Sequence, residues 1–144
     1  MPNIVQGNTI LNPFHQDGSG EIKKFDYIVS NPPFKLDFSD YRDALDTKEN
    51  QKRFFAGIPN IPPKDKKKMA IYLLFIQHIV ISLTDKGKAA IVVPTGFLTA
   101  TSIGLKIREY LIENKIFRGA ISMPTDIFAD TGTNVSIIFI DKNY

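Results

Sequence analysis

The sequence contains no cysteine, which excludes a disulfide framework and thiolate ligands for a metal ion. Its only histidines, His15 and His78, are far apart in the sequence, so a zinc site is not expected and we predict no metal centre.

Long apolar runs are also missing. The longest one, within residues 69–84, contains Gln77 and His78 and is too short to cross a bilayer. The N-terminus does not show the basic stretch followed by apolar residues that marks a signal peptide. The sequence therefore favours a cytoplasmic protein that does not contact a membrane.

Glycine patterns that bind phosphates are nearly absent. Gly18-Ser19-Gly20 is the only G-x-G, and it precedes a predicted strand instead of joining a strand to a helix. We interpret it as a flexible turn.

The composition is that of a globular protein, with 43% hydrophobic and 23% charged residues among 144. This length suits one domain, 1–144, with a long loop at 35–68. The net charge of +3 permits nucleic-acid binding but does not establish it.

The chain is organised around Asn31-Pro32-Pro33-Phe34, which follows the short apolar run at 25–30. The run is rich in β-branched and aromatic residues, so it predicts a buried parallel strand with a rigid turn at its carboxyl end. Ligands bind at that end of open α/β sheets. Proline fixes the turn, which presents an amide oxygen, a backbone carbonyl and an aromatic face in one geometry. Such a set suits a planar ligand with an amino group, for example a nucleobase.

The same four residues resemble the catalytic motif of S-adenosylmethionine-dependent amino methyltransferases, chiefly the DNA adenine enzymes. Five further stretches occur in the order seen in modification (M) subunits of type I restriction systems: Arg53–Pro59, Phe75–His78, Gly87–Pro94, Ile107–Glu113 and Thr131–Phe139. The resemblance covers nearly the whole chain. It implies an α/β fold, namely the carboxyl-terminal half of a Rossmann-like methyltransferase sheet, mostly parallel with one antiparallel strand and with helices on the faces.

The resemblance also implies a role for each residue of the motif. Asn31, Pro32, Pro33 and Phe34 would be catalytic: Asn31 Oδ1 and the Pro32 carbonyl would accept hydrogen bonds from the adenine amine, and Phe34 would stack on the base. The adenine must flip out of double-stranded DNA to reach them. Implied partners are a specificity subunit and a second M subunit.

The implied cofactor is S-adenosylmethionine, but the family's glycine-rich turn and the acidic residue of its second strand are absent from the sequence. We therefore expect a fragment that is inactive alone and binds the cofactor weakly or not at all. Asn8, at a position where the family often has an acidic residue, and Asn31 are the remaining candidates for cofactor contacts. A plain turn asparagine is an equal alternative for Asn8.

Apolar patterns predict the remaining elements. A short strand within residues 2–11 is expected to turn at Gly7-Asn8. After the loop, a buried helix at Met69–Thr84 closed by a Gly87 cap is followed by a buried strand at Lys88–Val93. Next come an amphipathic helix at Ser102–Glu113, with a hydroxyl cap at Thr101 or Ser102, and two antiparallel strands at Phe117–Met123 and Asn134–Ile140.

Residues 35–68 show no convincing periodicity, although 40–54 has room for a short helix. The P-x-x-P pattern within Ile58–Lys64 fits either a peptide ligand for an aromatic groove or, more simply, a rigid loop. The lysine-rich stretch Lys64–Lys68 either contacts phosphates or is a solvated charge run. We interpret His78 as a core or interface residue, and Phe97 as core in preference to pocket lining.

Two other functional classes stay open: an amino methyltransferase acting on RNA or on protein glutamine, and a non-catalytic interaction module. A last expectation concerns the sheet. The edge of strand 25–30 should be covered, either by residues 3–6 or by a second copy in a homodimer of the fragment.

Overall fold

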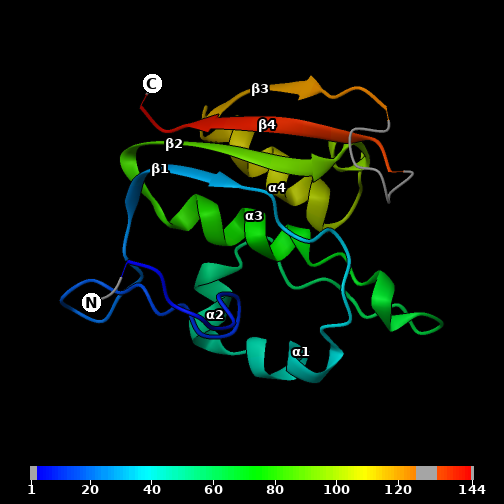
Figure 1. Ribbon diagram of the computed structural model, residues 1–144, viewed down its shortest axis with the longest axis horizontal. Coiled ribbons are helices and arrows are strands. Elements are labelled where there is room, and N and C mark those ends of the chain that lie inside the picture. Colours follow the sequence, from blue (N-terminus) through cyan, green and yellow to red (C-terminus); the bar gives the residue numbers. More distant parts are fainter. Residues whose placement is uncertain (1–2, 126–132, 144) are drawn as a thin grey trace.

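A four-stranded sheet forms one layer of the molecule (Figure 1). The computed structural model describes residues 3–125 and 133–143. Its strand order is β1-β2-β4-β3, with β1 parallel to β2 and β4 antiparallel to both β2 and β3. Three strands thus run one way and β4 runs against them, which confirms the expected mixture. The strands are β1 (Phe25–Ser30), β2 (Leu83–Pro94), β3 (Phe117–Ser122) and β4 (Val135–Asp141).

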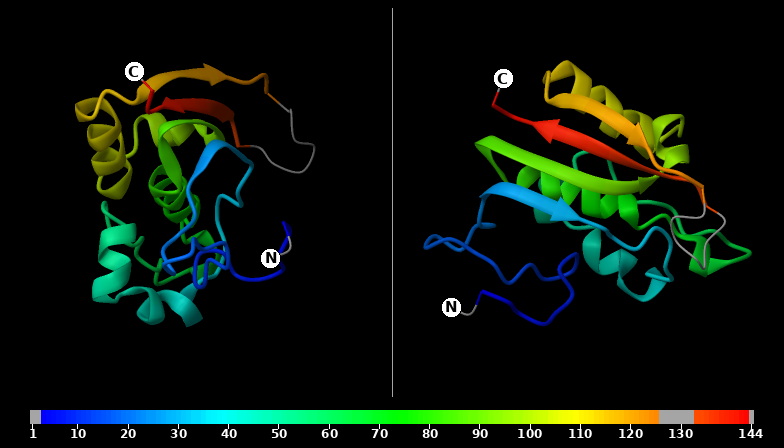
Figure 2. Two further views of the ribbon diagram at one scale, coloured as in Figure 1. Left: turned by 90° about the vertical axis from the view of Figure 1, so that its left-hand side faces the viewer. Right: turned by 45° about the horizontal axis from the view of Figure 1, so that its top comes forward.

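Two helices cover one face of this sheet, as the views in Figure 2 show. They are α3 (Tyr72–Ile81) and α4 (Ile103–Glu113). Alternate residues of the central strands point into this layer, among them Ile91 and Ile138, and both are fully buried. The expected helices at these places are confirmed.

A further layer packs on the far side of α3. It contains α1 (Ser39–Leu45), α2 (Lys48–Arg53) and the N-terminal segment, whose apolar side chains share a core with Leu74 of α3. Because α3 has a core on both sides, its sequence is apolar almost all round. The prediction of a long loop at 35–68 is only partly correct. Helices α1 and α2 occupy the 40–54 stretch, for which one short helix was considered, and the 3-10 helix η1 (Lys66–Lys68) follows.

The second face of the sheet carries no helix in the described part of the chain. Tyr27 and Val29 of β1 point to that side, and these residues are 78% and 84% exposed. Strand β1 is also an edge strand of the sheet, and its outer edge has no described partner. The prediction of a buried strand was therefore wrong for β1, and residues 3–6 do not cover its edge.

Three local predictions were also wrong: the strand within residues 2–11, the extension of the buried helix to Thr84, and the Gly87 cap. No strand forms in the described part of 2–11, where hydrogen bonds to Asn8 make a turn. Helix α3 ends at Ile81, and Gly87 lies inside β2, where the β1 pairing jumps from Leu83 to Lys88. Ser82 is the C-cap residue instead, and its hydroxyl donates to the His78 carbonyl over 2.7 Å.

Helix α4 begins as expected after Ser102, but the Ser102 hydroxyl makes no capping hydrogen bond. Its backbone has φ of 52°, which turns the residue away from the extended geometry that a serine cap uses. The turn at Gly18–Gly20 is confirmed, because the Asp17 carboxylate accepts hydrogen bonds from Ser19 and closes it.

Candidate functional site

The parallel pairing of β1 and β2 brings their carboxyl ends together, so the Asn-Pro-Pro-Phe motif lies beside Pro94. A pocket of about 750 Å³, here named the motif pocket, opens at this point. It is lined by Asn31, Pro32, Pro33, Phe34, Lys35, Ala70, Tyr72, Pro94, Gly96 and Thr133. The structure thus brings all four motif residues to one pocket.

Each motif residue has a different setting. Pro32 is buried, whereas Asn31 and Pro33 are exposed and Phe34 is half-buried. Among the described residues, the Asn31 amide has no hydrogen-bond partner, so both its polar atoms are free for a ligand. The buried Pro32 ring fixes the backbone on which that amide is mounted.

The chain that leaves the motif is held against the start of α3. The Tyr72 N–H donates to the Phe34 carbonyl over 3.3 Å, and the Leu36 N–H donates to the Met69 carbonyl over 3.1 Å. These two bonds join segments that are more than thirty residues apart in the sequence. The pocket residue Lys35 and the lysines of η1 therefore lie on neighbouring segments, and we name this set of lysines the basic rim.

Three aromatic rings support one another at the pocket, where Phe34 and Tyr72 are lining residues and Phe97 is not. Tyr72 meets Phe34 edge to face at a centroid distance of 6.2 Å, and it meets Phe97 in the same way at 6.1 Å. Burial raises the pKa of the Tyr72 hydroxyl to about 12, so that this group stays neutral. Phe97 is fully buried, as expected for a core residue.

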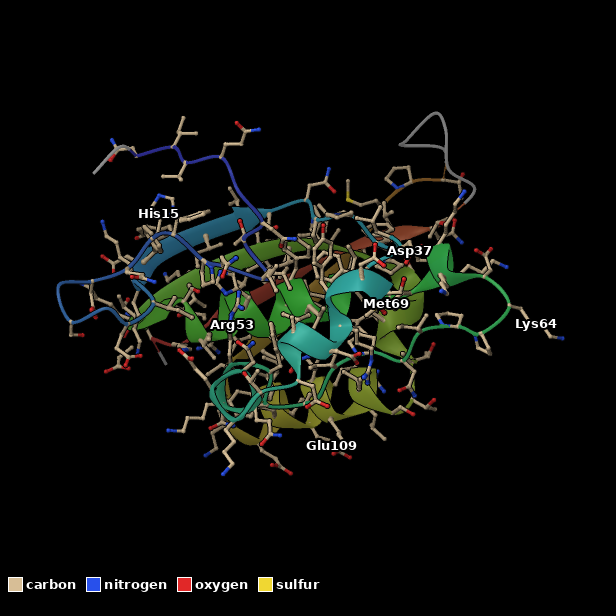
Figure 3. All side chains as sticks on the ribbon, turned by 90° about the horizontal axis from the view of Figure 1, so that it is seen from below. His15, Asp37, Arg53, Lys64, Met69 and Glu109 are labelled. Carbon is tan, nitrogen blue, oxygen red and sulfur yellow. The ribbon has the colours of Figure 1, made fainter. Side chains whose placement is uncertain are left out.

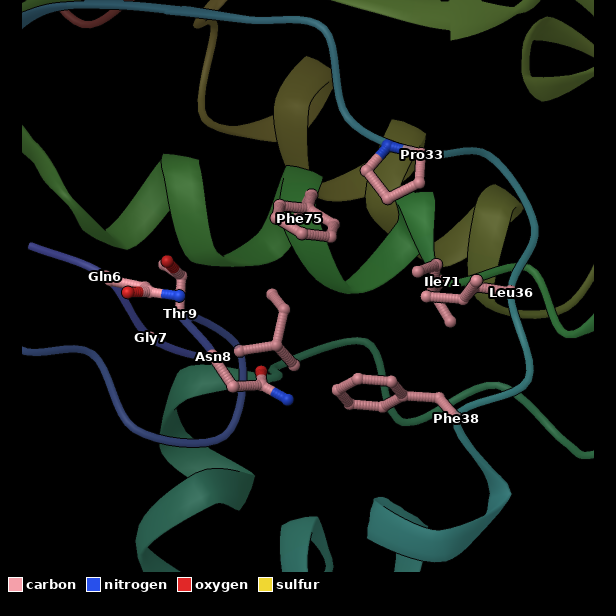
Figure 4. Close-up of a pocket in the computed structure, with 10 residues that line it drawn as sticks. Gln6, Gly7, Asn8, Thr9, Pro33, Leu36, Phe38, Ile71 and Phe75 are labelled. Carbon is pink, nitrogen blue, oxygen red and sulfur yellow. The ribbon is translucent and has the colours of Figure 1, made fainter.

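A second pocket, the Asn8 pocket, has a volume of about 440 Å³ and shares Pro33 with the first (Figure 4). Residues 6–10 form one wall, and the rest of the lining is apolar, with Pro33, Leu36, Phe38, Ile71 and Phe75. The Asn8 Oδ1 accepts a hydrogen bond from the Leu11 N–H over 3.0 Å. Asn8 is therefore a turn residue and also a pocket residue.

Sequence patterns did not identify two polar groups near these pockets. Tyr72 lies inside an apolar run, which is typical of a core residue. Arg53 is at the end of a helix in a region without clear periodicity, and the sequence marks it only as the first residue of the resembled stretch Arg53–Pro59. His78 is half-buried and pairs with Arg53 where α3 meets the N-terminal layer, which agrees with its interpretation as a core or interface residue. In the described residues, no group of histidine, aspartate and glutamate side chains is arranged to hold a metal ion.

The family model described as N-6 DNA Methylase matches residues 2–144. The chain belongs to this family. A type I restriction enzyme methylase subunit from Methanocaldococcus jannaschii is 29% identical over 139 residues, which are 96% of this chain and 24% of that protein. The EcoEI methylase subunit of Escherichia coli is 31% identical over 140 residues, or 96% of this chain and 24% of that protein.

Solved structures show the same fold. A type I restriction-modification methyltransferase subunit from Streptococcus thermophilus has a TM-score of 0.71 at 24% identity, covering 96% of this chain and 27% of that one. A protein from Listeria monocytogenes, described as a putative class I S-adenosylmethionine-dependent methyltransferase, has a TM-score of 0.53 at 21% identity, covering 85% of this chain and 33% of that one. The chain thus spans about a quarter of the length of the relatives it matches. The described residues include no helix long and apolar enough to cross a membrane.

Proposed function

We propose that this chain forms the base-binding part of a DNA methyltransferase that methylates the exocyclic amine of adenine. Its larger setting would be the modification subunit of a type I restriction-modification system. The observation that carries the proposal is the motif pocket, which Asn31, Pro32 and Phe34 line together at the carboxyl end of two parallel strands.

The residues of this pocket would compensate for the low nucleophilicity of the adenine amine. An adenine amine is a poor nucleophile because its lone pair is delocalised into the ring. Hydrogen bonds from its two hydrogens to Asn31 Oδ1 and the Pro32 carbonyl favour a pyramidal nitrogen and stabilise the positive charge that develops there. The amine proton then leaves to water, so the site needs no strong base.

Phe34 supplies the surface on which the base is held. Stacking on an aromatic side chain contributes roughly 1–3 kcal/mol per base. The Phe34 ring is half-buried, meets the Tyr72 ring edge to face and lines the motif pocket, where a base would stack on it. A duplex base reaches this ring only after it has flipped out of the helix.

The Asn8 pocket fits part of the methyl donor. Its apolar side chains suit a flat ring, and the Asn8 and Gln6 amides suit the polar edge of an adenine group. S-adenosylmethionine, when bound, supplies the methyl group. Asn8 would contact its adenine end, and Asn31 would lie where the two pockets approach each other at Pro33.

The basic rim suits the DNA backbone next to the flipped base. Lys35 lines the motif pocket, and the lysines of η1 are all exposed. Nearby Asp37 has its pKa lowered by its hydrogen bonds to Ser39 and also by the charges of Lys66 and Lys67. A specificity subunit and a second modification subunit would complete the DNA-bound assembly.

A transfer assay tests the proposal. The full-length protein that the gene encodes, with its partner subunits, would be incubated with labelled S-adenosylmethionine and unmodified DNA. We expect label in N6-methyladenine when the nucleosides are separated by mass spectrometry. RNA and a glutamine-containing protein serve as competing substrates, and preferential labelling of either would refute the proposal.

A further inference from the structure

We propose that Arg53 is a positioning residue for the Asn8 pocket. It sets the pocket's affinity by fixing the backbone wall at Thr9 and Ile10, although it does not itself line the pocket. The inference rests on the proposed function, in that the ligand of this pocket is taken to be the adenine end of S-adenosylmethionine.

The guanidinium of Arg53 joins three parts of the fold. Its Nη2 donates to the Thr9 carbonyl over 2.7 Å, and its Nη1 donates to the next carbonyl, that of Ile10. Its Nε donates to Nδ1 of His78 on α3 over 3.2 Å. The ring of Phe54 lies 4.7 Å from the guanidinium carbon and covers it on one side. Figure 3 shows Arg53 in the interior, between the N-terminal segment and α3.

This arginine is unusual because it is buried without an acidic partner in the described part of the chain. It is only 5% exposed, and its hydrogen bonds go to neutral acceptors. Burial lowers its pKa to about 10, so it remains charged at neutral pH. Burying such a charge carries a large desolvation penalty, which a leucine or methionine of similar size would not have. Unlike those residues, the guanidinium can hydrogen-bond to two consecutive carbonyls.

The wall that it holds is anchored by the buried Ile10 side chain but has few hydrogen bonds to other parts of the fold. Residues 6–10 belong to no strand or helix. Within the described residues, Arg53 is the one side chain from another element that hydrogen-bonds to this stretch. The remaining hydrogen bonds of the stretch are local ones, made by Leu11 and Asn12 to Asn8. Binding two successive carbonyls fixes two peptide planes and therefore the direction in which Asn8 presents its amide.

Replacement by lysine tests this role, because a lysine keeps the charge but cannot donate to both carbonyls and the histidine in one plane. Arg42 provides a matched control, since it also donates to two backbone carbonyls, those of Pro59 and Ile58, away from the pocket wall. In the full-length protein with its partner subunits, we expect Arg53→Lys to raise the KM for S-adenosylmethionine about 10- to 100-fold, with kcat within about twofold of wild type. Arg42→Lys should leave both constants near wild type.

Hydrogen exchange gives a readout that does not depend on activity. Amides of residues 6–12 should exchange faster in Arg53→Lys than in wild type, whereas those of α4 should not change. If Arg53→Lys does not fold, His78→Leu, which removes one acceptor and leaves both carbonyl bonds, should give a smaller rise in KM and in exchange.

Three results would overturn the inference: a loss of kcat at unchanged KM, an equal rise of KM in Arg42→Lys, or unchanged exchange at 6–12. A wild-type protein that neither binds S-adenosylmethionine nor transfers methyl groups would overturn the proposed function instead. In that event faster exchange at 6–12 in Arg53→Lys would still support the positioning of the wall by Arg53.

Discussion

The Tyr72 N–H donates a hydrogen bond to the Phe34 carbonyl, and the rings of the two residues also meet edge to face. The first residue of α3 thus holds the last residue of the motif by backbone and by side chain. Phe34 needs this support because it is half-buried and has one side open to the motif pocket. The helix start therefore belongs to the site as much as the strand end does.

Removing the Tyr72 ring should loosen Phe34 and weaken base binding. Tyr72→Leu should lower kcat/KM for DNA about tenfold and reduce the fluorescence rise of a 2-aminopurine at the target position, since a base stacks poorly on a mobile ring. Tyr72→Phe should behave like wild type, because among the described residues the hydroxyl has no hydrogen-bond partner. Tyr110→Leu removes a ring from a stacked pair with Phe55 outside the motif pocket and serves as the control. Equal losses in both leucine variants would contradict the support role.

Substitution of Asn31 should separate catalysis from cofactor binding. In the full-length protein, Asn31→Ala should reduce methyl transfer by about 10²–10³, the usual cost of removing one pre-organised hydrogen-bonding group. Binding of S-adenosylmethionine, measured by calorimetry, should change little, because the Asn8 pocket is built from other residues. Asn60→Ala, in an exposed loop, provides the control. Near-normal turnover of Asn31→Ala would remove Asn31 from the mechanism.

The sequence predicted the central features of the fold well where local pattern and tertiary surroundings agree. The apolar helix α3 and the central strand β2 are examples, because both pack in the main core. The prediction failed where the outcome depends on distant residues. Residues 3–6 have strand-like composition but pair with no described strand, and β1 looks buried by composition although nothing described covers Val29.

The site was predictable only in its local part. Residues Asn31–Phe34 are contiguous, and each proline restricts its own backbone φ, so the geometry of the turn follows from the local sequence. Lys35 and η1 come together through backbone hydrogen bonds between segments far apart in sequence, which no periodicity reveals. The same holds for Arg53, because its acceptors at Thr9 and Ile10 lie more than forty residues earlier.

The basic rim should appear in the salt dependence of DNA binding. Each phosphate contact made by a lysine adds about 0.9 to the slope of log K against log salt concentration. The double variant Lys66→Gln with Lys67→Gln should therefore reduce the slope by about one to two, measured by fluorescence anisotropy. Lys48→Gln with Lys52→Gln makes the same charge change on α2 and should leave the slope unaltered. Equal slopes for wild type and the first variant would show that the run is only a solvated surface.

Acid should destabilise the protein partly through His78. Burial, together with the charge of Arg53, lowers its pKa from 6.5 to about 4. The unfolded chain then binds more protons between these values, so stability is lost as pH falls from about 6.5 to 4. The loss attributable to His78 has an upper limit of about 3 kcal/mol. His78→Asn keeps an acceptor for Arg53 but does not titrate, so urea unfolding at pH 5 and pH 7 should differ less than in wild type; an unchanged difference would contradict this assignment.

The bare edge of β1 predicts that this chain of 144 residues associates with itself. Exposed strand edges recruit other strands, and Tyr27 and Val29 add an apolar surface that a two-fold dimer would bury. Sedimentation at rising concentration should show a monomer–dimer equilibrium. Val29→Lys should shift it toward monomer, because a charged side chain on an edge strand opposes pairing. Ile112→Lys, which places the same charge at an exposed apolar site of α4, should leave the equilibrium unchanged. A wild-type chain that stays monomeric at millimolar concentration would show that β1 needs no partner.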